Sequence, residues 1–379
     1  MAKRYAQGPW WRLREPGIHG RQAAAGWLFL APVIVILGLF LVLPIAAAAW
    51  VSFSDWNGNG SPLGAHAHWV GLTNYRHLLT TPGLDQNNFG EALRNNLYYV
   101  LLVVPTQTAV SLFLAVLVNR RLKFVGFFRT AFYFPSVTSS VAITVLFLFL
   151  FNPSGVINKL LSYLGATGPS WLYDPRGLFH VILDQFGVHQ SSSLSNGFFL
   201  GVSYWDWLAG PSIAMCVFIV MAVFTTSGTF MLLFLAGLQN IDESLNEAAA
   251  LDGATEWRKF RYITVPMIRP TLFTVVTLGL IGTWQVFDQI YVGTKGSPLN
   301  TTLTPAFLSF SASFNSNEWG VGAAIAFILF AIIVFFTVAT RLLTRNPDRV
   351  PRRRRFGPTQ RIGNQDASRV ASAAPGSAP

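Results

Sequence analysis

The sequence predicts an all-α membrane protein with six transmembrane helices and both termini in the cytoplasm. Hydrophobic residues make up 52% of the 379 positions and charged residues only 11%, a balance far from that of soluble globular domains. The charges are clustered, and the intervals between the clusters are about as long as the ~20 residues that a helix needs to cross a bilayer. The third observation is the uneven distribution of Lys and Arg between the two sides of these helices.

The six spans follow from the charge-free intervals. Five of these intervals exceed ~20 residues, and the run at 270–287 becomes long enough once Asp288 is included. The resulting transmembrane domain covers residues 27–343, with a basic segment at 1–26 before it and a basic tail at 344–379 that we expect to be disordered. We place the spans at 27–51, 97–119, 130–152, 212–238, 271–293 and 320–343.

Basic residues define the cytoplasmic side. With six spans, 22 of the 27 Lys and Arg residues fall on the side that holds both termini, the 120–129 segment and the 239–270 loop, and 5 fall on the other. Because basic residues near span ends stay in the cytoplasm, the chain is predicted to be a multi-pass protein of the cell (plasma or inner) membrane in this orientation. The same bias explains the net charge of +11 without a nucleic-acid partner, and the Arg352–Arg355 run is interpreted as an anchor for anionic lipids.

The segment at 180–210 is predicted to be an external insertion that lies along the membrane surface. Its apolar pieces are too short to cross, and a seventh span here would move the basic 239–270 loop to the outside. Trp205 and Trp207 suit the headgroup level, where amphipathic aromatic side chains concentrate. His180 and His189 lack the spacing of metal ligands, so we expect no metal site.

The loop after the fourth span is predicted to form two helices joined at Gly253. Asp242 caps the first helix, whose first turns are acidic. Gly253 suits a helix-ending position with positive φ, and Thr255 caps a second short helix over 256–262. Pro266 then stops or kinks the chain near the start of the next span.

Two interpretations of this loop are open from the residues alone: a helical connector, or a lever that transmits force from a cytoplasmic partner. Its pattern is Glu-Ala-Ala, three residues, Gly, nine residues, Ile, one residue, then Val-Pro. It resembles the EAA loop of binding-protein-dependent ABC importer permeases, in which Leu usually stands at the position of Val265. The resemblance implies that the ATPase-coupling residues are Glu247, Ala248, Ala249, Asp252, Gly253, Ile263 and Pro266.

The resemblance covers roughly residues 27–343 and is to the sugar permeases, which include maltose and glycerol-phosphate permeases. It implies the type I ABC importer permease fold. Two departures are a Thr294–Pro298 turn with fewer glycines than the family pattern and the insertion at 180–210. The segments that carry the resemblance outside the loop are WLFLAP (27–32), SFSDWNG (52–58), VGLTNYRHLL (70–79), FRTAFYFPSV (128–137), FNPSGVINKLL (151–161), LAGLQNI (235–241) and FDQIYVGTKGSP (287–298).

A heteromeric carbohydrate importer is what this resemblance implies. The chain would pair, among membrane lipids, with a second homologous permease, a dimer of ATP-binding subunits and an extracytoplasmic solute-binding protein. Because the sequence lacks the G-x-x-x-x-G-K-[ST] phosphate-binding motif, the chain itself is expected to bind no cofactor, and ATP and Mg belong to the partner subunits. Glu247 would make the charged contact with the ATPase, and Gly253 would be the hinge between the two helices.

Polar residues inside the spans are candidates for the solute pathway. Asp288 is the only acid within a span, and an intramembrane charge is expected to face protein or a water-filled cavity. Helical spacing places Trp284, Asp288 and Tyr291 on one face with Gln285 beside them, which suits a sugar. A structural role at the permease interface, or hydroxyls bonded to their own helix, also explains these residues. The candidates are Trp284, Gln285, Asp288, Gln289, Tyr291, Thr226, Ser227 and Thr229.

The predicted function is ATP-driven import of a di- or oligosaccharide. Import of glycerol phosphate or a polyol, and an ion-coupled secondary carrier, are the alternatives. A carrier typically shows internal repeats or several intramembrane ionisable groups, and the sequence shows no clear repeat and one such group. An enzyme would require a catalytic constellation, and the sequence has no paired intramembrane carboxylates and no H-E-x-x-H motif. The chain is therefore predicted to be a transport subunit and not an enzyme.

Overall fold

The computed structural model describes residues 21–64, 67–120, 123–187 and 195–343. The predictions for residues 1–20, for the tail at 344–379 and for His189 lie outside this part of the chain. Within it, the chain is helical apart from loops, isolated bridges and one two-stranded sheet. Its helices are long and apolar enough for five membrane spans, or six if a sharply bent pair counts as one, which agrees with the predicted helical membrane fold.

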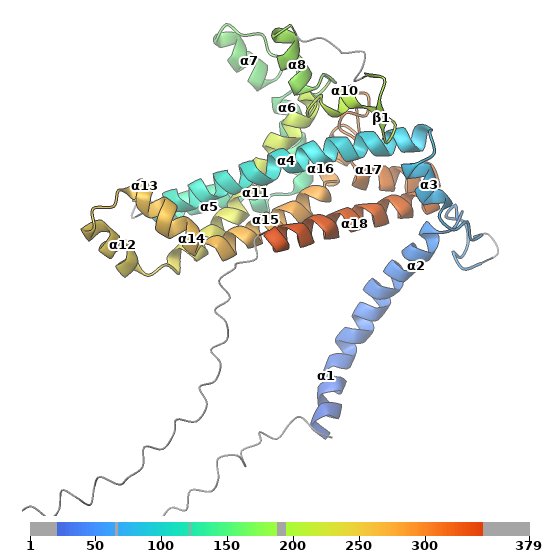
Figure 1. Ribbon diagram of the computed structural model, residues 1–379, viewed down its shortest axis with the longest axis horizontal. Coiled ribbons are helices and arrows are strands. Elements are labelled where there is room, and N and C mark those ends of the chain that lie inside the picture. Colours follow the sequence, from blue (N-terminus) through green and yellow to red (C-terminus); the bar gives the residue numbers. More distant parts are fainter. Residues whose placement is uncertain (1–20, 65–66, 121–122, 188–194, 344–379) are drawn as a thin grey trace, which may run out of the picture.

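Four long helices run side by side and form the bundle (Figure 1). Met231 and Phe234, both 0% exposed, belong to one apolar cluster with Ala115 and Val118, and this cluster joins the two longest of these helices. The sequence-based spans at 212–238 and 320–343 match two of the four to within one residue at each end. The four helices are α4 (Leu84–Asn119), α11 (Ile213–Gln239), α15 (Arg269–Trp284) and α18 (Trp319–Leu343).

The first span leans away from this bundle (Figure 1). It consists of α1 (Arg21–Leu37), a π-helical turn η2 (Gly38–Val42) and α2 (Leu43–Ser52). Its apolar window is 0% buried, so lipid or another subunit must cover its surface. A helix long and apolar enough to cross a membrane runs over Ala25–Ser52, where the sequence predicts the span at 27–51.

The helix that contains the predicted second span begins before that span. Helix α4 starts at Leu84 and not near residue 97, because its polar first turns continue the helix beyond the apolar part. Phe89, 1% exposed, packs there with Leu78 of the short helix α3 (Thr73–Leu79). Tertiary packing therefore extends a helix that hydropathy cannot detect.

The third span is broken, and the prediction of one continuous helix at 130–152 is wrong. Helices α5 (Val125–Val137) and α6 (Ser140–Leu150) meet at an angle of 95°. Pro135 lacks the N–H of a regular helix, and nearby hydroxyls bond to the backbone there. Thr138 Oγ1 donates to Phe134 O at 3.0 Å, and Ser136 Oγ donates to Thr225 O of α11 at 2.6 Å.

The fifth span is interrupted as well. Helix α15 begins at Arg269 and ends at Trp284, and α16 (Asp288–Gly293) follows after a gap at 285–287. Two remote side chains bind the carbonyls that the gap leaves free: Asn96 Nδ2 donates to Trp284 O at 3.2 Å, and Thr304 Oγ1 donates to Val286 O at 3.1 Å. The predicted helix over 271–293 is therefore two helices with a fixed break between them.

Loops and short elements lie outside the four long helices, beyond α6 and near α3 (Figure 1). They include α7 (Val156–Tyr163), α8 (Leu178–Gln185), α10 (Tyr204–Trp207), α17 (Pro305–Phe310) and the π turn η4 (Ser311–Asn315). Strands β1 (Phe198–Phe199) and β2 (Val202–Ser203) pair antiparallel, with Phe198 opposite Ser203 and Phe199 opposite Val202. This hairpin packs on α4, since a Cβ at Gly90 would lie 2.1 Å from Leu200 O.

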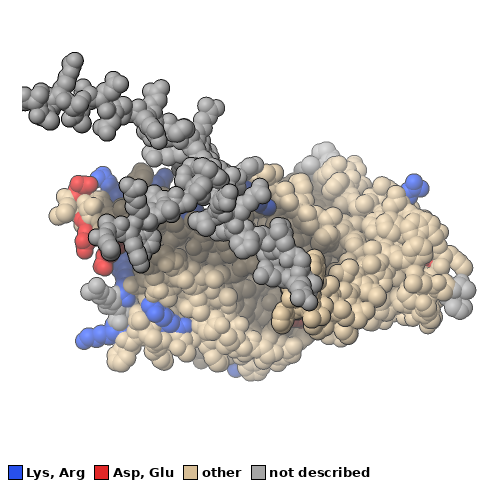
Figure 2. Space-filling view, turned by 90° about the horizontal axis from the view of Figure 1, so that it is seen from below, with Lys and Arg blue, Asp and Glu red and all other residues tan. Residues whose placement is uncertain are grey.

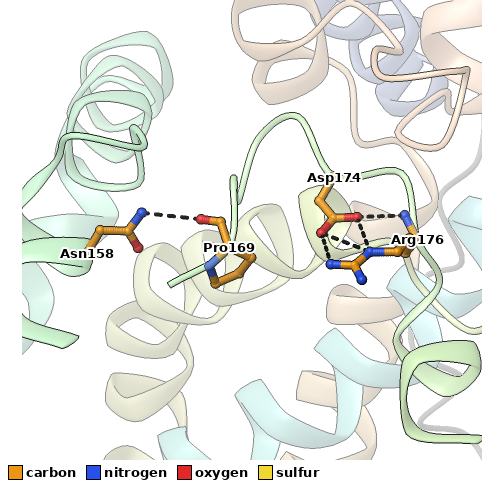
Figure 3. Close-up of polar contacts among 4 residues, drawn as sticks. All are labelled: Asn158, Pro169, Asp174 and Arg176. Carbon is orange, nitrogen blue, oxygen red and sulfur yellow. Dashed lines mark hydrogen bonds and ion pairs between the residues drawn. The ribbon is translucent and has the colours of Figure 1, made fainter. Parts of the chain in front are cut away.

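Local polar contacts hold the segment between α7 and α8 (Figure 3). Asn158 Nδ2 donates to Pro169 O at 3.2 Å. Arg176 Nη2 lies 2.7 Å from Asp174 Oδ2, and this guanidinium holds the pKa of the Asp174 carboxyl below its usual value. Further along, the Trp205 ring stacks on His180 with centroids 4.5 Å apart, and Trp207 Nε1 donates to Phe199 O at 3.1 Å. The depth of these two Trp rings in a bilayer stays a prediction.

Candidate functional site

The EAA loop (residues 239–270) has the predicted two-helix form. Asp242 Oδ1 accepts from Ser244 N at 3.0 Å and caps α12 (Glu243–Leu251). This backbone bond lowers the pKa of the exposed Asp242 carboxyl. Gly253 then has φ +73°, and Thr255 Oγ1 accepts from Arg258 N at 3.4 Å at the start of α13 (Glu256–Lys259).

The second helix of the loop continues further than predicted. A π turn, η3 (Phe260–Thr264), follows α13 and leads into α14 (Val265–Met267). The π turn closes with the N–H of Val265 on Phe260 O, so the hydrogen-bond pattern shifts directly before Pro266, which has no N–H. Pro266 is thus accommodated near the start of α14 instead of ending the helix.

The coupling residues predicted from the EAA pattern lie together at one end of the bundle. No residue of α12 is buried, and Glu247 and Ala248 are exposed. Figure 2 shows acidic and basic side chains gathered at this end, whereas other residue types cover most of the remaining visible face. Exposed apolar side chains accompany these charges, with Leu251 91%, Trp257 67% and Tyr262 71% exposed. Large apolar side chains beside charges on an open surface are typical of a docking site.

One buried residue connects the loop to the bundle. Ile268, directly before α15, is 1% exposed and packs in the cluster of α4 and α11 that contains Met231 and Phe234. Ile263 and Pro266 are half-buried, in contrast to the exposed first helix. The outer part of the loop is therefore free to contact a partner, while its inner part is held by the spans.

A cavity of about 260 Å³, the central cavity, lies among α4, α11 and the break in the fifth span. Four of the predicted pathway residues line it, with amide, carboxylate and hydroxyl groups: Thr226, Gln285, Asp288 and Gln289. The other lining residues are Tyr99, Gln107, Ser140, Ala222, Phe230, Leu278, Gly279, Gly282, Thr283, Val286 and Phe287.

The other four pathway candidates lie elsewhere. Trp284 is 1% exposed and stacks on Phe336 of α18 with centroids 5.5 Å apart, because the break at 285–287 removes the helical spacing that placed it beside Asp288. Tyr291 packs on Phe287 and Phe310. Ser227 Oγ donates to Val223 O at 2.5 Å within its own helix. The N–H of Thr229 donates to Ser136 Oγ at 3.1 Å.

Two polar residues of α4 that the sequence reasoning missed also line the central cavity. Tyr99 Oη donates to Gln289 Oε1 at 3.1 Å, and Thr226 Oγ1 donates to Gln107 Oε1 at 2.7 Å. The signal was available, since Gln107 is an amide in the middle of a charge-free interval. Among the lining residues there is no Lys or Arg, and Asp288 is the one carboxylic acid.

A second cavity, of about 340 Å³, lies at the end opposite the EAA loop. The start of α4, the 175–212 segment and the 299–301 turn form it, and Glu91, Arg94, Arg176, His180 and Asp206 are among its lining residues. Its charged walls contrast with the largely neutral walls of the central cavity.

Comparison with known proteins gives one family. The profile of a family described as a binding-protein-dependent transport system inner membrane component matches residues 107–349. A probable ABC transporter permease protein of Pyrococcus horikoshii is 32% identical over 80% of this chain and 89% of its own. The lactose transport system permease protein LacF of Rhizobium radiobacter is 30% identical over 81% and 90%. The trehalose/maltose transport system permease protein MalF of Thermococcus litoralis is 28% identical over 84% and 92%.

The fold also matches a solved structure. A crystal structure of a bacterial ABC transporter involved in the import of the acidic polysaccharide alginate superposes with a TM-score of 0.64. The match covers 86% of this chain and 96% of that one at 19% identity, so it supports the arrangement of helices alone.

Proposed function

The chain belongs to the binding-protein-dependent transport system inner membrane components and is a permease subunit of an ATP-binding cassette importer; from this premise we propose that it carries a di- or oligosaccharide. Such a subunit is an inner membrane protein that crosses several times and is not itself catalytic. Membership of this family also excludes the ion-coupled secondary carrier that the sequence left open.

The residues that line the central cavity support the proposed class of solute. Gln285, Asp288, Gln289 and Thr226 offer donors and acceptors for hydroxyl groups, and Phe287 and Tyr99 supply aromatic surface for the C–H faces of a sugar. The relatives named for lactose, trehalose/maltose and arabinooligosaccharides point in the same direction. Because no Lys or Arg lines this cavity, glycerol phosphate is the weaker candidate, and a neutral polyol is the closer alternative.

Family membership implies an ATPase and an extracytoplasmic binding protein as partners. The assembly that we propose contains a second homologous permease and two ATP-binding subunits, with ATP and Mg on the latter. Both termini and the EAA loop lie in the cytoplasm in this arrangement, as the Lys and Arg count predicts. The charged second cavity then faces outward, where the binding protein docks.

Coupling runs from the EAA loop to the central cavity. The ATPase grips the exposed face of α12, with Glu247 as the charged contact and Gly253 as the hinge. Closure of the ATPase on ATP moves the loop, and buried Ile268 passes this motion to α15. Helix α15 ends at the break beside Gln285, so a shift of this helix changes the walls of the cavity.

The test is uptake by the complete importer in proteoliposomes. The complex is reconstituted with its ATPase, second permease and binding protein, and ATP-driven uptake of radiolabelled lactose, maltose, trehalose, sorbitol and glycerol 3-phosphate is compared. We expect uptake of at least one disaccharide and none of glycerol 3-phosphate. Transport of only sorbitol or glycerol 3-phosphate would overturn the proposed solute class.

A further inference from the structure

Gln107 differs from every other polar residue at the wall of the central cavity. It lies in the middle of α4 and is 0% exposed. Its Oε1 accepts the hydrogen bond from Thr226 Oγ1 at 2.7 Å, yet its Nε2 is buried and has no hydrogen-bond partner among the described residues. Buried amide groups are almost always paired, so an unpaired one requires an explanation.

The structure holds the Gln107 amide in one orientation. Thr226 Oγ1 lies 2.7 Å from both Gln107 Oε1 and Ala222 O, so this hydroxyl holds one end of the amide against α11. Across the contact, a Cβ at Gly279 would lie 2.2 Å from Gln107 Nε2, so a side chain there would displace the amide. Gln107 and Gly279 both line the central cavity, so the amide belongs to the cavity wall.

This orientation determines what the amide binds. Because one end of the amide is held at Thr226 Oγ1, the other end is left as a neutral polar group, and such a group pairs with a hydroxyl. Hydroxyl groups are the main polar groups of a carbohydrate. A carboxylate or phosphate would instead be matched by a cationic side chain, and none lines this cavity.

We propose that the unpaired end of the Gln107 amide forms a hydrogen bond with one hydroxyl of the transported carbohydrate in the central cavity, with Thr226 and Gly279 positioning the amide. This inference rests on the proposed function and adds to it a residue that determines specificity. The energetic pattern fits, since a polar group left unpaired in the empty protein and paired in the loaded one favours the loaded state.

The experiment combines stability with the specificity of uptake. In the reconstituted importer, Gln107→Leu is compared with the unmodified chain for the disaccharide that is imported best among lactose, maltose and trehalose. We expect the apparent KM to rise about tenfold, the effect of one lost hydrogen bond, without a fall in the thermal unfolding temperature. Stability is retained because Leu removes an unpaired buried polar group and Thr226 keeps its bond to Ala222 O.

Monodeoxy analogues of the same disaccharide give the decisive readout. For the unmodified importer, the apparent KM should be about tenfold higher for the one analogue that lacks the bonded oxygen than for the parent disaccharide. For Gln107→Leu, the apparent KM should be the same for this analogue and for the parent disaccharide. A merely structural role of Gln107 would lower uptake of every analogue by the same factor, and that result would overturn the inference. Equal KM values for Gln107→Leu and the unmodified chain would also overturn it.

A second variant displaces the Gln107 amide without changing residue 107 itself. Gly279→Ala places a Cβ against Nε2 and should reproduce the loss of discrimination seen with Gln107→Leu. Gly38→Ala is the matched glycine control, since a Cβ there meets nothing within 4 Å, and Thr108→Val is the matched polar control, since Thr108 bonds only its own helix at Val104 O. If Gly279→Ala discriminates among the monodeoxy analogues as strongly as the unmodified chain does, that result counts against the inference.

The outcomes for the two proposals are separate. If the unmodified importer carries no disaccharide in the uptake panel, the proposed function fails. If it carries a disaccharide and Gln107→Leu discriminates among the analogues as the unmodified chain does, only the role of Gln107 fails.

Discussion

The EAA loop and the central cavity differ in what determines their structure. In the loop, Asp242 caps on Ser244 and Thr255 caps on Arg258, so each contact closes within three residues. In the cavity, Thr226 binds Gln107 across 119 residues of sequence, and Asn96 binds the end of α15 across 188. Local chemistry therefore forms the proposed coupling surface, and packing of distant helices forms the proposed solute site. Variants in the two regions should consequently fail in different ways.

The largest effect expected is on stability, at a residue that sequence reasoning assigned to the pathway. Trp284→Ala should lower the free energy of unfolding by about 3–5 kcal/mol, because the ring is 1% exposed and packs against α18. Thermal unfolding of the purified protein measures this. Gln285→Ala, the adjacent cavity residue, is the matched control and should leave the unfolding temperature nearly unchanged. An unchanged unfolding temperature in Trp284→Ala would contradict its placement.

At the EAA loop, the expected effect is on assembly and not on folding. Glu247→Ala should weaken ATPase binding by about thirtyfold or more, the effect of truncating a charged residue at the centre of an interface. Its exposed position predicts an unchanged unfolding temperature. Copurification of the ATPase and ATP-driven uptake are the measurements, with Glu318→Ala at the other end of the bundle as the control. Normal coupling in Glu247→Ala would refute the role of Glu247.

Substitutions at the hinge between the two loop helices should act through backbone strain alone. Gly253 has φ +73°, and an added Cβ would meet nothing within 4 Å. Gly253→Val should therefore destabilise the loop by about 2 kcal/mol through its backbone, whereas Gly253→Asn should have a smaller effect, because Asn tolerates positive φ. Hydrogen exchange of the 243–259 amides distinguishes the two. Equal exchange in both variants would show that positive φ is not required.

In the central cavity, a neutral substitution should change solute affinity. Asp288→Asn is expected to raise the apparent KM for the imported disaccharide about tenfold, which corresponds to about 1.4 kcal/mol. Tyr291→Phe should leave KM unchanged, because the Tyr291 ring packs on Phe287 and Phe310 outside the cavity. Concentration-dependent uptake measures both variants. If Tyr291→Phe raises KM as much as Asp288→Asn, the helical-face prediction from the sequence was the better one.

The smallest effect expected is a pH dependence at the loop cap. The pKa of Asp242 is lowered in the folded loop, so the carboxylate stabilises the cap above the ordinary Asp pKa of 3.8 and loses this effect as the pH falls through the lower folded value. Between pH 7 and pH 5 the cap should therefore be constant. Hydrogen exchange of Ser244, corrected for intrinsic rates, should show loss of protection only below about pH 4. Asp242→Asn, which keeps an acceptor, should abolish this dependence.

Sequence reasoning succeeded where the signal is local or repeated along one helix. The spans at 27–51, 212–238 and 320–343 follow from hydropathy, and the two loop helices follow from their capping residues. It failed at the 95° bend near residue 138 and at the gap of 285–287, both inside apolar intervals. These breaks are held by side chains such as Ser136 and Asn96, whose partners lie far away in the chain.

Gln107 shows the same difference between what the sequence reveals and what only the structure reveals. The sequence shows a polar residue in an apolar span, which indicates burial in protein, but it does not show which helix faces that residue. The pathway residues were assigned by helical offsets within the fifth span, and the break there separates Trp284 from Gln285 and Asp288.

By itself, the sequence determined that this chain is a helical membrane protein with a two-helix loop, because hydropathy, charge bias and capping act over a few turns of one helix. The resemblance of that loop to the EAA loop of ABC importer permeases added the family. Only the tertiary structure decided which polar groups meet in the central cavity. The physical reason is that backbone groups and side chains buried in the bundle must find partners, and those partners come from helices that the sequence does not place beside one another.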